Sequence, residues 1–587
     1  MKDLMIIWNS LSGRQNYSPT NNNPNHPDRP DEQDIEVKTS RMPSNIQRKS
    51  SVVVNRFFNA ALPVHTNGRR KWPKNIFVLM FLGLLSLLCG YVILVCQPYE
   101  YILKFKTTFT EGGEIFQLWE KPEVNLYLKV YLFNITNHEE FLDGRESKLR
   151  FQQVGPYVYR EFFSHNNIVF NNNGTLSSIP SHPLQYMPEM SNGTEEDLLI
   201  LPNIALFSIT NVMRDASYIS RWGLNMLIRQ TDTRPLVQMT AHEFMFGYES
   251  TLVTLGNHLM PSWIKFDKLG LIDRMYDFDG DFETIYTGKT DIRLTGLIEK
   301  YNGDVNLPQW SGKCANVQGA SDGVKFPSYI QPNDTLLFFR KSLCRSERMI
   351  HVGEKFINGL HTYQFTFMEN EFDNGAVNPE NKCFCRKGRC LKSGLLDVTD
   401  CYYGFPIALS YPHFYQSDPS LLEVLEGLEP KKELHESYFF IQPKSGLPVD
   451  LAFRFQINMA LQDIGHMERM EKFINFTFPM LWFEIGMYEL PYSLNMRFWF
   501  YLSVLPVAEE VTTYLLFLFG AVLLIWSVVK ILSYQVKESP TDWLETEMER
   551  RRHRAKNDKL TGWKEKEMDT YNSFLTPDDA NLTMTVQ

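Results

Sequence analysis

The stretch 75–96 reads NIFVLMFLGLLSLLCGYVILVC and contains no charged residue. As a helix it is long enough to cross the hydrocarbon core of a bilayer, which is about 30 Å thick. A second uncharged stretch, VTTYLLFLFGAVLLIWSVV at 511–529, meets the same test. Uncharged runs of this length are rare in the cores of soluble proteins. We therefore predict two transmembrane helices, at 75–96 and 511–529.

The two predicted helices divide the chain into a tail at 1–74, a long middle segment at 97–510 and a tail at 530–587. Arg69, Arg70, Lys71 and Lys74 precede the first helix, and Lys530 follows the second. Because basic residues stay on the cytosolic side, we expect both tails in the cytosol and the middle segment outside or in a lumen. The first helix begins too late for a cleaved signal peptide, so it should be an uncleaved signal anchor.

The composition of the 587 residues excludes several classes of protein. Aromatic residues make up 14% and charged residues 22%, and the net charge is −9. So many aromatic side chains argue against disorder, and the charged fraction argues against a polytopic transporter. The charge is unevenly distributed. Residues 1–74 carry 12 basic and 6 acidic side chains, whereas 75–529 carry 37 and 51. An acidic middle segment makes nucleic acid an unsuitable partner.

N-glycosylation sequons support the predicted orientation. Five potential sites lie in the middle segment: Asn134, Asn173, Asn192, Asn333 and Asn475. One sequon is weak evidence, but five in one segment favour a lumenal or extracellular location. Asn16 and Asn581 also match the pattern, and we predict that both are unused because they lie in the cytosolic tails.

Six of the eight cysteines fall within 88 residues of the middle segment: Cys314, Cys344, Cys383, Cys385, Cys390 and Cys401. An even number in an oxidising compartment indicates disulfides, for which 15 pairings exist. A metal knuckle at Cys383, Cys385 and Cys390 is the alternative. No histidine is suitably spaced for it, so we expect no metal and no cofactor. Cys383 and Cys385 should bond to different partners, because alternating cysteines pair poorly with each other.

The middle segment mixes strand and helix patterns. Alternating stretches such as 154–163 and 438–442 are typical of strands, and 202–232 has apolar residues at helical intervals. It shows no internal repeat and no clear linker. We therefore predict one large β-rich domain with helical insertions, an α+β fold.

Several collinear motifs in this segment resemble the class B scavenger receptor family. They include QVGPYVYRE at 153–161, EFMFGY at 243–248, WSGKC at 310–314, EGLEP at 426–430 and RFQIN at 454–458. The family includes the lysosomal integral membrane protein and the insect Croquemort and sensory neuron membrane proteins, and we expect an insect-type member. The resemblance implies an antiparallel β-barrel core, an apical helical bundle and a hydrophobic tunnel toward the bilayer. It also implies the pairs Cys314–Cys383, Cys344–Cys401 and Cys385–Cys390.

The function implied by the resemblance is a scavenger receptor that binds lipids, lipoproteins or apoptotic and modified particles at its apex. Hydrophobic cargo would then pass through the tunnel to the membrane. The candidate apex residues are Phe207, Met213, Tyr218, Trp222, Met226, Arg229 and Gln230, for which packing within the bundle is the simpler interpretation. Some relatives carry a lysine where this chain has Gln230. Arg229 and Arg234 could replace that cation, with Asp232 offsetting them, so specificity for oxidised lipoprotein or fatty acid is in doubt.

Catalysis is not expected, because the chain contains no Walker loop, nucleophile elbow or zinc-protease helix. The carboxylates at 277–283 lack the spacing of an EF-hand and suit a solvated turn, and His242-Glu243 has no visible catalytic partner. Aromatic residues at 497–501, with Tyr99 and Tyr101, suit a membrane interface.

The C-terminal tail bears on location. Tyr571 and Phe574 fit an endocytic motif for an adaptor complex. We expect a plasma-membrane protein that cycles to endosomes or lysosomes. The alternative function is an endolysosomal sorting receptor that binds a lumenal protein cargo through its apex.

Overall fold

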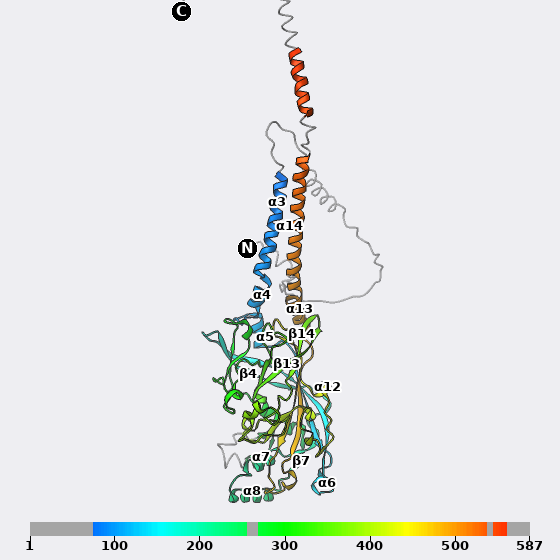
Figure 1. The fold of residues 1–587 in the computed structure, drawn as a ribbon. Helices are drawn as coiled ribbons and strands as arrows, with labels where there is room; N and C mark the ends of the chain where they lie inside the picture. The colour runs from blue at the N-terminus through cyan, green and yellow to red at the C-terminus, as the bar shows by residue number, and fades with distance from the viewer. Residues whose placement is uncertain (1–73, 255–267, 537–543, 560–587) are drawn as a thin grey trace, which may run out of the picture. The chain divides into compact units, whose positions relative to one another are not determined.

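The computed structural model describes residues 74–254, 268–536 and 544–559. The chain divides into two units, Phe81–Trp526 and a second made of Met1–Met80 with Ser527–Gln587. The first unit contains the folded domain together with most of both apolar helices (Figure 1). The pockets and the side-chain clusters described below all lie in this unit.

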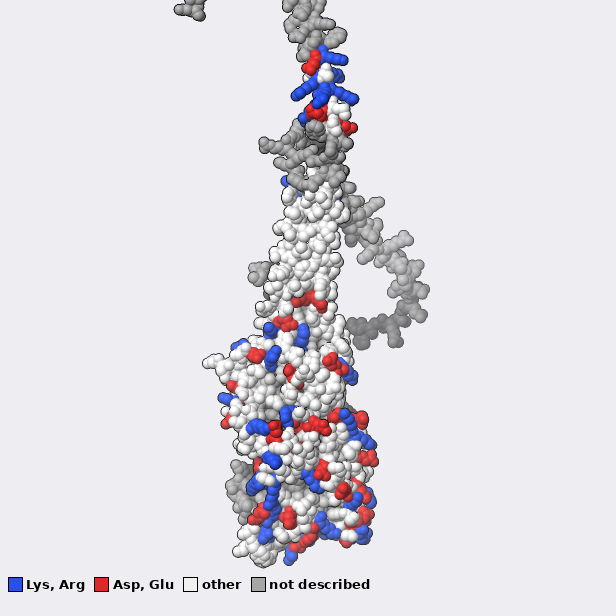
Figure 2. Space-filling model, in the orientation of Figure 1, with Lys and Arg blue, Asp and Glu red and all other residues white. Residues whose placement is uncertain are grey.

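Two helices are long and apolar enough to cross a membrane: α3 (Lys74–Cys96) and α14 (Leu505–Val536). They cover both stretches predicted to be transmembrane. Helical structure continues beyond the predicted bounds through α4 (Pro98–Thr107) after α3 and through α13 (Tyr492–Trp499) and Phe500–Val504 before α14. The surface of α3 and α14 carries almost no charged side chains (Figure 2). Two such helices fit a two-pass membrane protein.

Within Phe81–Trp526 the two apolar helices pack closely against each other. Ser86 Oγ donates a hydrogen bond to the backbone carbonyl of Leu516 at 2.8 Å. A Cβ atom placed on Gly83 would lie 3.2 Å from the Gly520 carbonyl oxygen, and one on Gly520 would lie 3.0 Å from the Gly83 carbonyl oxygen. Glycine is needed at both positions because the backbones approach so closely, as in other small-residue contacts between membrane helices.

One large sheet of twelve strands forms the centre of the domain, and its strands pair antiparallel except β17 with β2. In order of pairing, its main path is β12 (Leu336–Arg340), β13 (Arg345–Ile357), β14 (Leu360–Phe367), β18 (Tyr438–Ile441), β19 (Pro448–Ala460), β20 (Thr477–Met487), β1 (Leu126–Ile135), β2 (Leu149–Glu161) and β17 (Leu425–Glu426). Beside this path, β16 (Ile407–Ser410) pairs with β19 and β15 (Leu396–Asp397), and β5 (Leu184–Tyr186) pairs with β2. The sheet includes most of the two stretches predicted as strands. Its closure into a barrel stays a prediction.

Smaller sheets and short helices surround the large sheet. The smaller sheets are β11 (Ile298–Tyr301), β10 (Glu283–Tyr286), β4 (Thr175–Ser181) and β3 (Ser164–Phe170) in that order, β6 (Leu198–Pro202) with β7 (Leu236–Thr240), and β8 (Tyr248–Glu249) with β9 (Lys268–Leu269). The remaining short helices are α5 (Glu114–Glu120), α6 (His138–Leu142), α9 (Ala241–Phe246), α11 (Leu271–Met275) and α12 (Lys432–His435).

The aromatic residues that argued against disorder fill the core. Phe338, Phe367, Phe439 and Phe453 from four strands of the large sheet pack with ring centroids 5.0–6.3 Å apart. Almost every residue of β19 and β20 is buried, because both faces of these strands are covered. Strands covered on both sides lose the alternation that marks a half-exposed strand.

The single helix predicted over 202–232 is instead two helices, α7 (Ile204–Met213) and α8 (Tyr218–Gln230). The Asn203 side chain caps α7 by accepting a hydrogen bond from the Leu206 backbone. The Ser217 side chain caps α8 in the same way through Ser220. Ser217 is a preferred N-cap residue, so it starts a new helix inside what the periodicity predicted as one. Figure 1 shows α8 at the end of the domain that lies away from α4 and α13.

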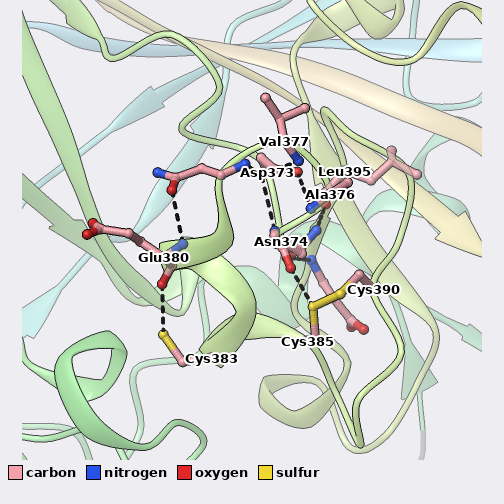
Figure 3. The surroundings of a disulfide bond; sticks show 12 residues. Asp373, Asn374, Ala376, Val377, Glu380, Cys383, Cys385, Cys390 and Leu395 are labelled. Atoms are coloured by element: carbon pink, nitrogen blue, oxygen red, sulfur yellow. Dashed lines mark hydrogen bonds between the residues drawn. A yellow bond between two sulfur atoms is a disulfide. The ribbon is translucent and has the colours of Figure 1, made fainter.

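Three disulfides link the six clustered cysteines: Cys314–Cys383, Cys344–Cys401 and Cys385–Cys390. These are the pairs that the family resemblance implies. The loop before Cys383 is fixed by Asp373, whose fully buried carboxylate accepts hydrogen bonds from the backbone of Gly375, Ala376, Val377 and Asn378 (Figure 3). Cys383 and Cys385 bond to different partners, as expected for alternating cysteines.

Candidate functional site

An apolar pocket lies where α5 and α13 meet the ends of β19 and β20. Its cavity volume is about 80 Å³. Its walls are almost wholly aliphatic or aromatic, and include Trp119, Leu126, Leu451, Met487, Leu494 and Phe498. Because α13 leads directly into the apolar helix α14, the pocket lies at the end of the domain nearest that helix (Figure 1).

Two charged residues interrupt the apolar wall of this pocket, the exposed Glu123 and the buried Lys325. Lys325 is fully buried, and its Nζ donates hydrogen bonds to the carbonyl oxygen of Phe326 at 2.7 Å and to Ser328 Oγ at 3.0 Å. Burial lowers the pKa of Lys325 to about 7, because an ammonium is poorly solvated there. The sequence analysis missed this residue, since a single lysine after an Asp-Gly turn gives no signal.

A second, smaller pocket with a cavity volume of about 20 Å³ lies between α7, α11 and the strands β16 and β19. Ile204, Leu271, Met275, Phe405 and Ile457 are among the residues that line it. The two pockets share no lining residue, so they are separate cavities in this structure.

The face of α8 that is turned to solvent carries large apolar side chains. Tyr218, Ile219, Trp222 and Met226 are 75%, 77%, 56% and 51% exposed. Their spacing puts them on one side of the helix, and the other side packs on the domain through Leu224 and Ile228. Four large apolar side chains gathered on one exposed helix face are typical of an interaction surface. We call these four residues the α8 face.

The remaining apex candidates lie in different surroundings. Phe207 is fully buried on α7 and packs on Phe473 and Phe478, so its position is a core position, not part of an exposed surface. Met213 is half-buried at the end of α7. The helical pattern could not separate these residues from the α8 face, because a buried helix and a half-exposed helix carry similar apolar residues.

Charged residues beside the α8 face are paired with one another. Arg229 donates to Glu468 at 2.7 Å, while Gln230 is exposed and uncharged. Asp232 pairs with both Arg469 at 2.7 Å and Arg234 at 3.3 Å. Both arginines that could replace the missing lysine therefore already have acidic partners.

Aromatic side chains are also exposed near the start of α14. Tyr101 on α4 is 72% exposed, and Tyr492, Trp499 and Phe500 project from the helical stretch that precedes α14. Tyr99 is buried instead. This distribution matches the aromatic belts of membrane proteins.

The potential glycosylation sites differ in accessibility. Asn173, Asn192, Asn333 and Asn475 are exposed. Asn134 is half-buried on β1, where its Oδ1 accepts a hydrogen bond from the Ile200 backbone at 2.9 Å. The two sequons at Asn16 and Asn581, and the endocytic motif at Tyr571 and Phe574, lie outside the described residues.

The other acidic motifs pair with cations of the protein itself. Asp281 pairs with Lys341, and Asp277 pairs with Arg274 at 3.3 Å. His242 Nδ1 lies 3.2 Å from Glu195, on the surface. These contacts favour the structural interpretation of both stretches.

Comparison with known proteins places this architecture. The model of the CD36 family matches residues 79–531. Scavenger receptor class B member 1 of Sus scrofa is 31% identical, over 79% of this chain and 90% of its own length. Protein peste of Drosophila melanogaster is 29% identical, over 63% of this chain and 67% of its own. Lysosome membrane protein 2 of Mus musculus is 29% identical, over 68% and 84%. The match runs through the folded domain and both apolar helices, which confirms the resemblance found in the sequence: the chain belongs to the CD36 family.

Proposed function

We propose that this protein is a membrane receptor that binds lipids or lipoprotein-type particles and passes hydrophobic cargo to the bilayer without catalysis. Relatives named as scavenger receptors support the receptor class. The two apolar helices and the apolar pockets support a route for lipid. Ligands would include lipoproteins and apoptotic or modified particles, captured at the α8 face.

The pocket between α5 and α13 is the observation that carries the proposal. Each methylene moved from water into such a pocket contributes roughly 0.8 kcal/mol, so contact with the apolar walls would hold part of an acyl chain. Since the pocket lies beside the start of the membrane helix, cargo that leaves it enters lipid rather than water. No energy source is needed, because the transfer is downhill.

The smaller pocket beside α7 supports the first part of the route. We propose that a hydrophobic tunnel, enclosed by a barrel formed from the large sheet, joins this pocket to the larger one when the side chains between them move. An apical helical bundle formed around α7 and α8 would be its entrance.

A plug in the larger pocket tests this function. Leu494, which is 2% exposed on α13, would be replaced by tryptophan, and uptake of a fluorescent fatty acid and of a cholesteryl ester would be measured in expressing cells. The expected result is a loss of uptake at equal surface expression. Leu434→Trp is the matched control, because Leu434 is 56% exposed and lies outside the pocket. Uptake that Leu494→Trp leaves unchanged would reject the route.

The proposed location is the plasma membrane, with cycling to endosomes and lysosomes. Both tails would be cytosolic, and Tyr571 with Phe574 would bind an adaptor complex. Protease protection of tagged tails in intact cells tests the orientation: digestion of either tag without permeabilisation contradicts it.

A second candidate is an endolysosomal sorting receptor that binds a lumenal protein. The exposed α8 face favours it, because aromatic and methionine side chains are frequent at the centres of protein interfaces. Co-purification of one lumenal protein, lost on Trp222→Ala or Met226→Ala while lipid uptake persists, would support this function. Lipid uptake without any such partner would support the first.

A further inference from the structure

Three side chains distant in sequence meet inside the domain: His165 on β3, Glu283 on β10 and Asp322 in the loop before β12. Their side chains are 0%, 5% and 12% exposed. His165 Nε2 lies 2.9 Å from Glu283 Oε1 and 3.5 Å from Asp322 Oδ2, and the three atoms all lie within 4.8 Å of one another. None of the three residues lines either pocket.

Strand register explains why His165 and Glu283 meet. Both β3 and β10 pair with β4, His165 opposite Pro180 and Glu283 opposite Ser178. Residues two apart on a strand point to the same face, and so do residues directly opposite across a ladder. The four-stranded sheet therefore turns both side chains to one side.

The second nitrogen of His165 fixes which ring atom faces the carboxylates. Nδ1 lies 2.8 Å from the Trp119 backbone carbonyl, which can only accept a hydrogen bond, so Nδ1 carries a hydrogen. Nε2 therefore faces two carboxylate oxygens, which attract a positive charge to this position, either a proton on the ring or a bound cation. Nε2 and Glu283 Oε1 are both buried without a hydrogen-bond partner, although they are close together. The direction of these two atoms relative to each other does not suit a hydrogen bond between them.

Two other buried carboxylates of the domain each have a cationic side chain as a partner. Glu161 pairs with Arg340 at 3.3 Å, and Glu484 pairs with Arg454 at 2.5 Å. Within the part of the chain that the structure describes, no lysine or arginine forms an ion pair with Glu283 or Asp322. The cluster therefore consists of two acidic groups and an imidazole that converge without a lysine or arginine among them.

We propose that His165, Glu283 and Asp322 bind a divalent transition-metal ion, with zinc as the preferred metal. Zinc takes imidazole nitrogen and carboxylate oxygen ligands at about 2.0–2.2 Å, which puts neighbouring ligand atoms about 3–3.5 Å apart. The observed distance of 3.5 Å fits this spacing, and that of 2.9 Å is slightly shorter. Imidazole disfavours calcium and magnesium, which prefer oxygen ligands.

Trp119 supplies the outer contacts that a metal site needs. Its carbonyl accepts from His165 Nδ1, its Nε1 donates to Asp322 Oδ2 at 3.3 Å, and its ring stacks on the imidazole. Contacts of this kind fix the orientation of metal ligands. Because Trp119 also lines the large pocket, the metal would hold one wall of that pocket in place. The sequence analysis expected no metal, since these three residues have no recognisable spacing.

Metal content of the full-length protein is the first test. The chain would carry a tag without histidine, be produced in zinc-supplemented cells and be purified in detergent without chelator. We expect one zinc ion per chain by mass spectrometry, and X-ray absorption that shows imidazole and oxygen ligands. Removal of zinc should lower the unfolding midpoint by about 2 °C or more. Substoichiometric metal, sulfur ligands, or a midpoint that neither zinc nor chelator moves would overturn the proposal.

Variants locate the ion. His165→Gln should lose zinc, whereas His182→Gln should keep it, because His182 lies in the neighbouring Glu161 cluster that already contains Arg340. His165→Lys supplies a fixed cation, so this variant should fold without zinc and be insensitive to chelator, even if His165→Gln fails to fold. Zinc retained at full stoichiometry by His165→Lys would show that the ion lies elsewhere and reject the site.

Discussion

The indole ring of Trp119 lies almost flat on the imidazole of His165, with the ring centroids 3.6 Å apart and the planes inclined by 17°. One side of the same tryptophan borders the large apolar pocket, and the other side borders the cluster of buried titratable residues. A substitution in the pocket wall should therefore alter the His165 cluster, and a substitution in the cluster should alter the pocket wall. We expect Trp119→Leu to reduce lipid uptake and the unfolding midpoint together.

Lys325 should destabilise the protein at neutral pH. Burial lowers its pKa to about 7, whereas the unfolded chain keeps the ordinary value near 10.5. Between these values the unfolded state binds more protons, so stability should rise with pH from about 7 to 10.5. Lys325→Met should raise the free energy of unfolding by about 1–4 kcal/mol at pH 7 and abolish this rise. Denaturant unfolding across the pH range measures both effects.

The exposed Lys148 gives the control for this prediction. Lys148→Met should change neither the free energy of unfolding nor its pH dependence. A Lys325→Met variant less stable than wild type at pH 7 would show that the hydrogen bonds of its ammonium outweigh the cost of burial.

Glu484 should be important for the stability of the large sheet. It pairs with Arg454 from β19 and, at 3.1 Å, with Lys129 from β1. Burial by itself raises the pKa of Glu484, but Arg454, the hydrogen bond from Tyr488 and Lys129 together outweigh it, and the net pKa is lowered. Glu484→Gln leaves Arg454 buried without its partner, so we expect a loss of about 3 kcal/mol in the free energy of unfolding.

The control for Glu484 is an exposed ion pair. Glu426 pairs with Arg150 at 3.1 Å, and both side chains are about half exposed. Glu426→Gln should cost less than about 1 kcal/mol in chemical denaturation. Equal losses from the two variants would contradict the importance given to burial.

Acid should weaken the domain through two stacked histidines. The rings of His413 and His435 are parallel within 6° and 4.4 Å apart. Burial lowers their pKa values to about 4 and about 3, while the unfolded chain titrates near 6.5. As pH falls below 6.5, the histidines of the unfolded state bind protons that those of the native state do not bind. The free energy of unfolding therefore decreases progressively toward pH 4.

His435→Asn should reduce this loss, because it removes one of the two titrating rings. The asparagine oxygen can still accept the Lys431 N–H that His435 Nδ1 accepts now, so the local hydrogen bond is kept. The slope of the unfolding free energy between pH 6.5 and 4 should fall by up to about 1.4 kcal/mol per pH unit. His466 is exposed, so His466→Asn should keep the wild-type slope. Parallel curves for wild type and His435→Asn would contradict the prediction.

The three disulfides should contribute unequally. Cys344 and Cys401 are separated by 57 residues, whereas Cys385 and Cys390 are separated by 5. Since a longer loop loses more entropy when it closes, the first bond should contribute about 4 kcal/mol and the second about 2 kcal/mol. Paired cysteine-to-serine variants, compared by thermal unfolding, measure the difference. A larger loss from the 385/390 pair would contradict the loop-entropy argument.

The sequence predicted the parts of the fold that leave a local pattern. The two apolar helices follow from their uncharged runs, and the family follows from collinear motifs. The break between α7 and α8 was missed because Ser217 gives a helix start inside a continuous apolar periodicity. The extension of α14 back through α13 was missed because an uncharged apolar run marks only the apolar part of the helix.

The candidate sites were harder to predict because distant segments build them. His165, Glu283 and Asp322 are brought together by strand register, which no spacing in the chain reveals. Phe207 and Trp222 belong to similar helical patterns, yet one is buried and the other is 56% exposed. Only tertiary packing decides which side of each helix is covered.

The close packing of α3 and α14 through Gly83 and Gly520 has a consequence for shedding. The chain of the folded domain continues into α3 at its N-terminal end and into α14 at its C-terminal end. One proteolytic cut beside either helix therefore leaves the domain attached to the other helix. Release of a soluble form into the medium would require two cuts. A singly nicked protein would remain on the cell, still joined to both helices, one directly and one through their packed interface.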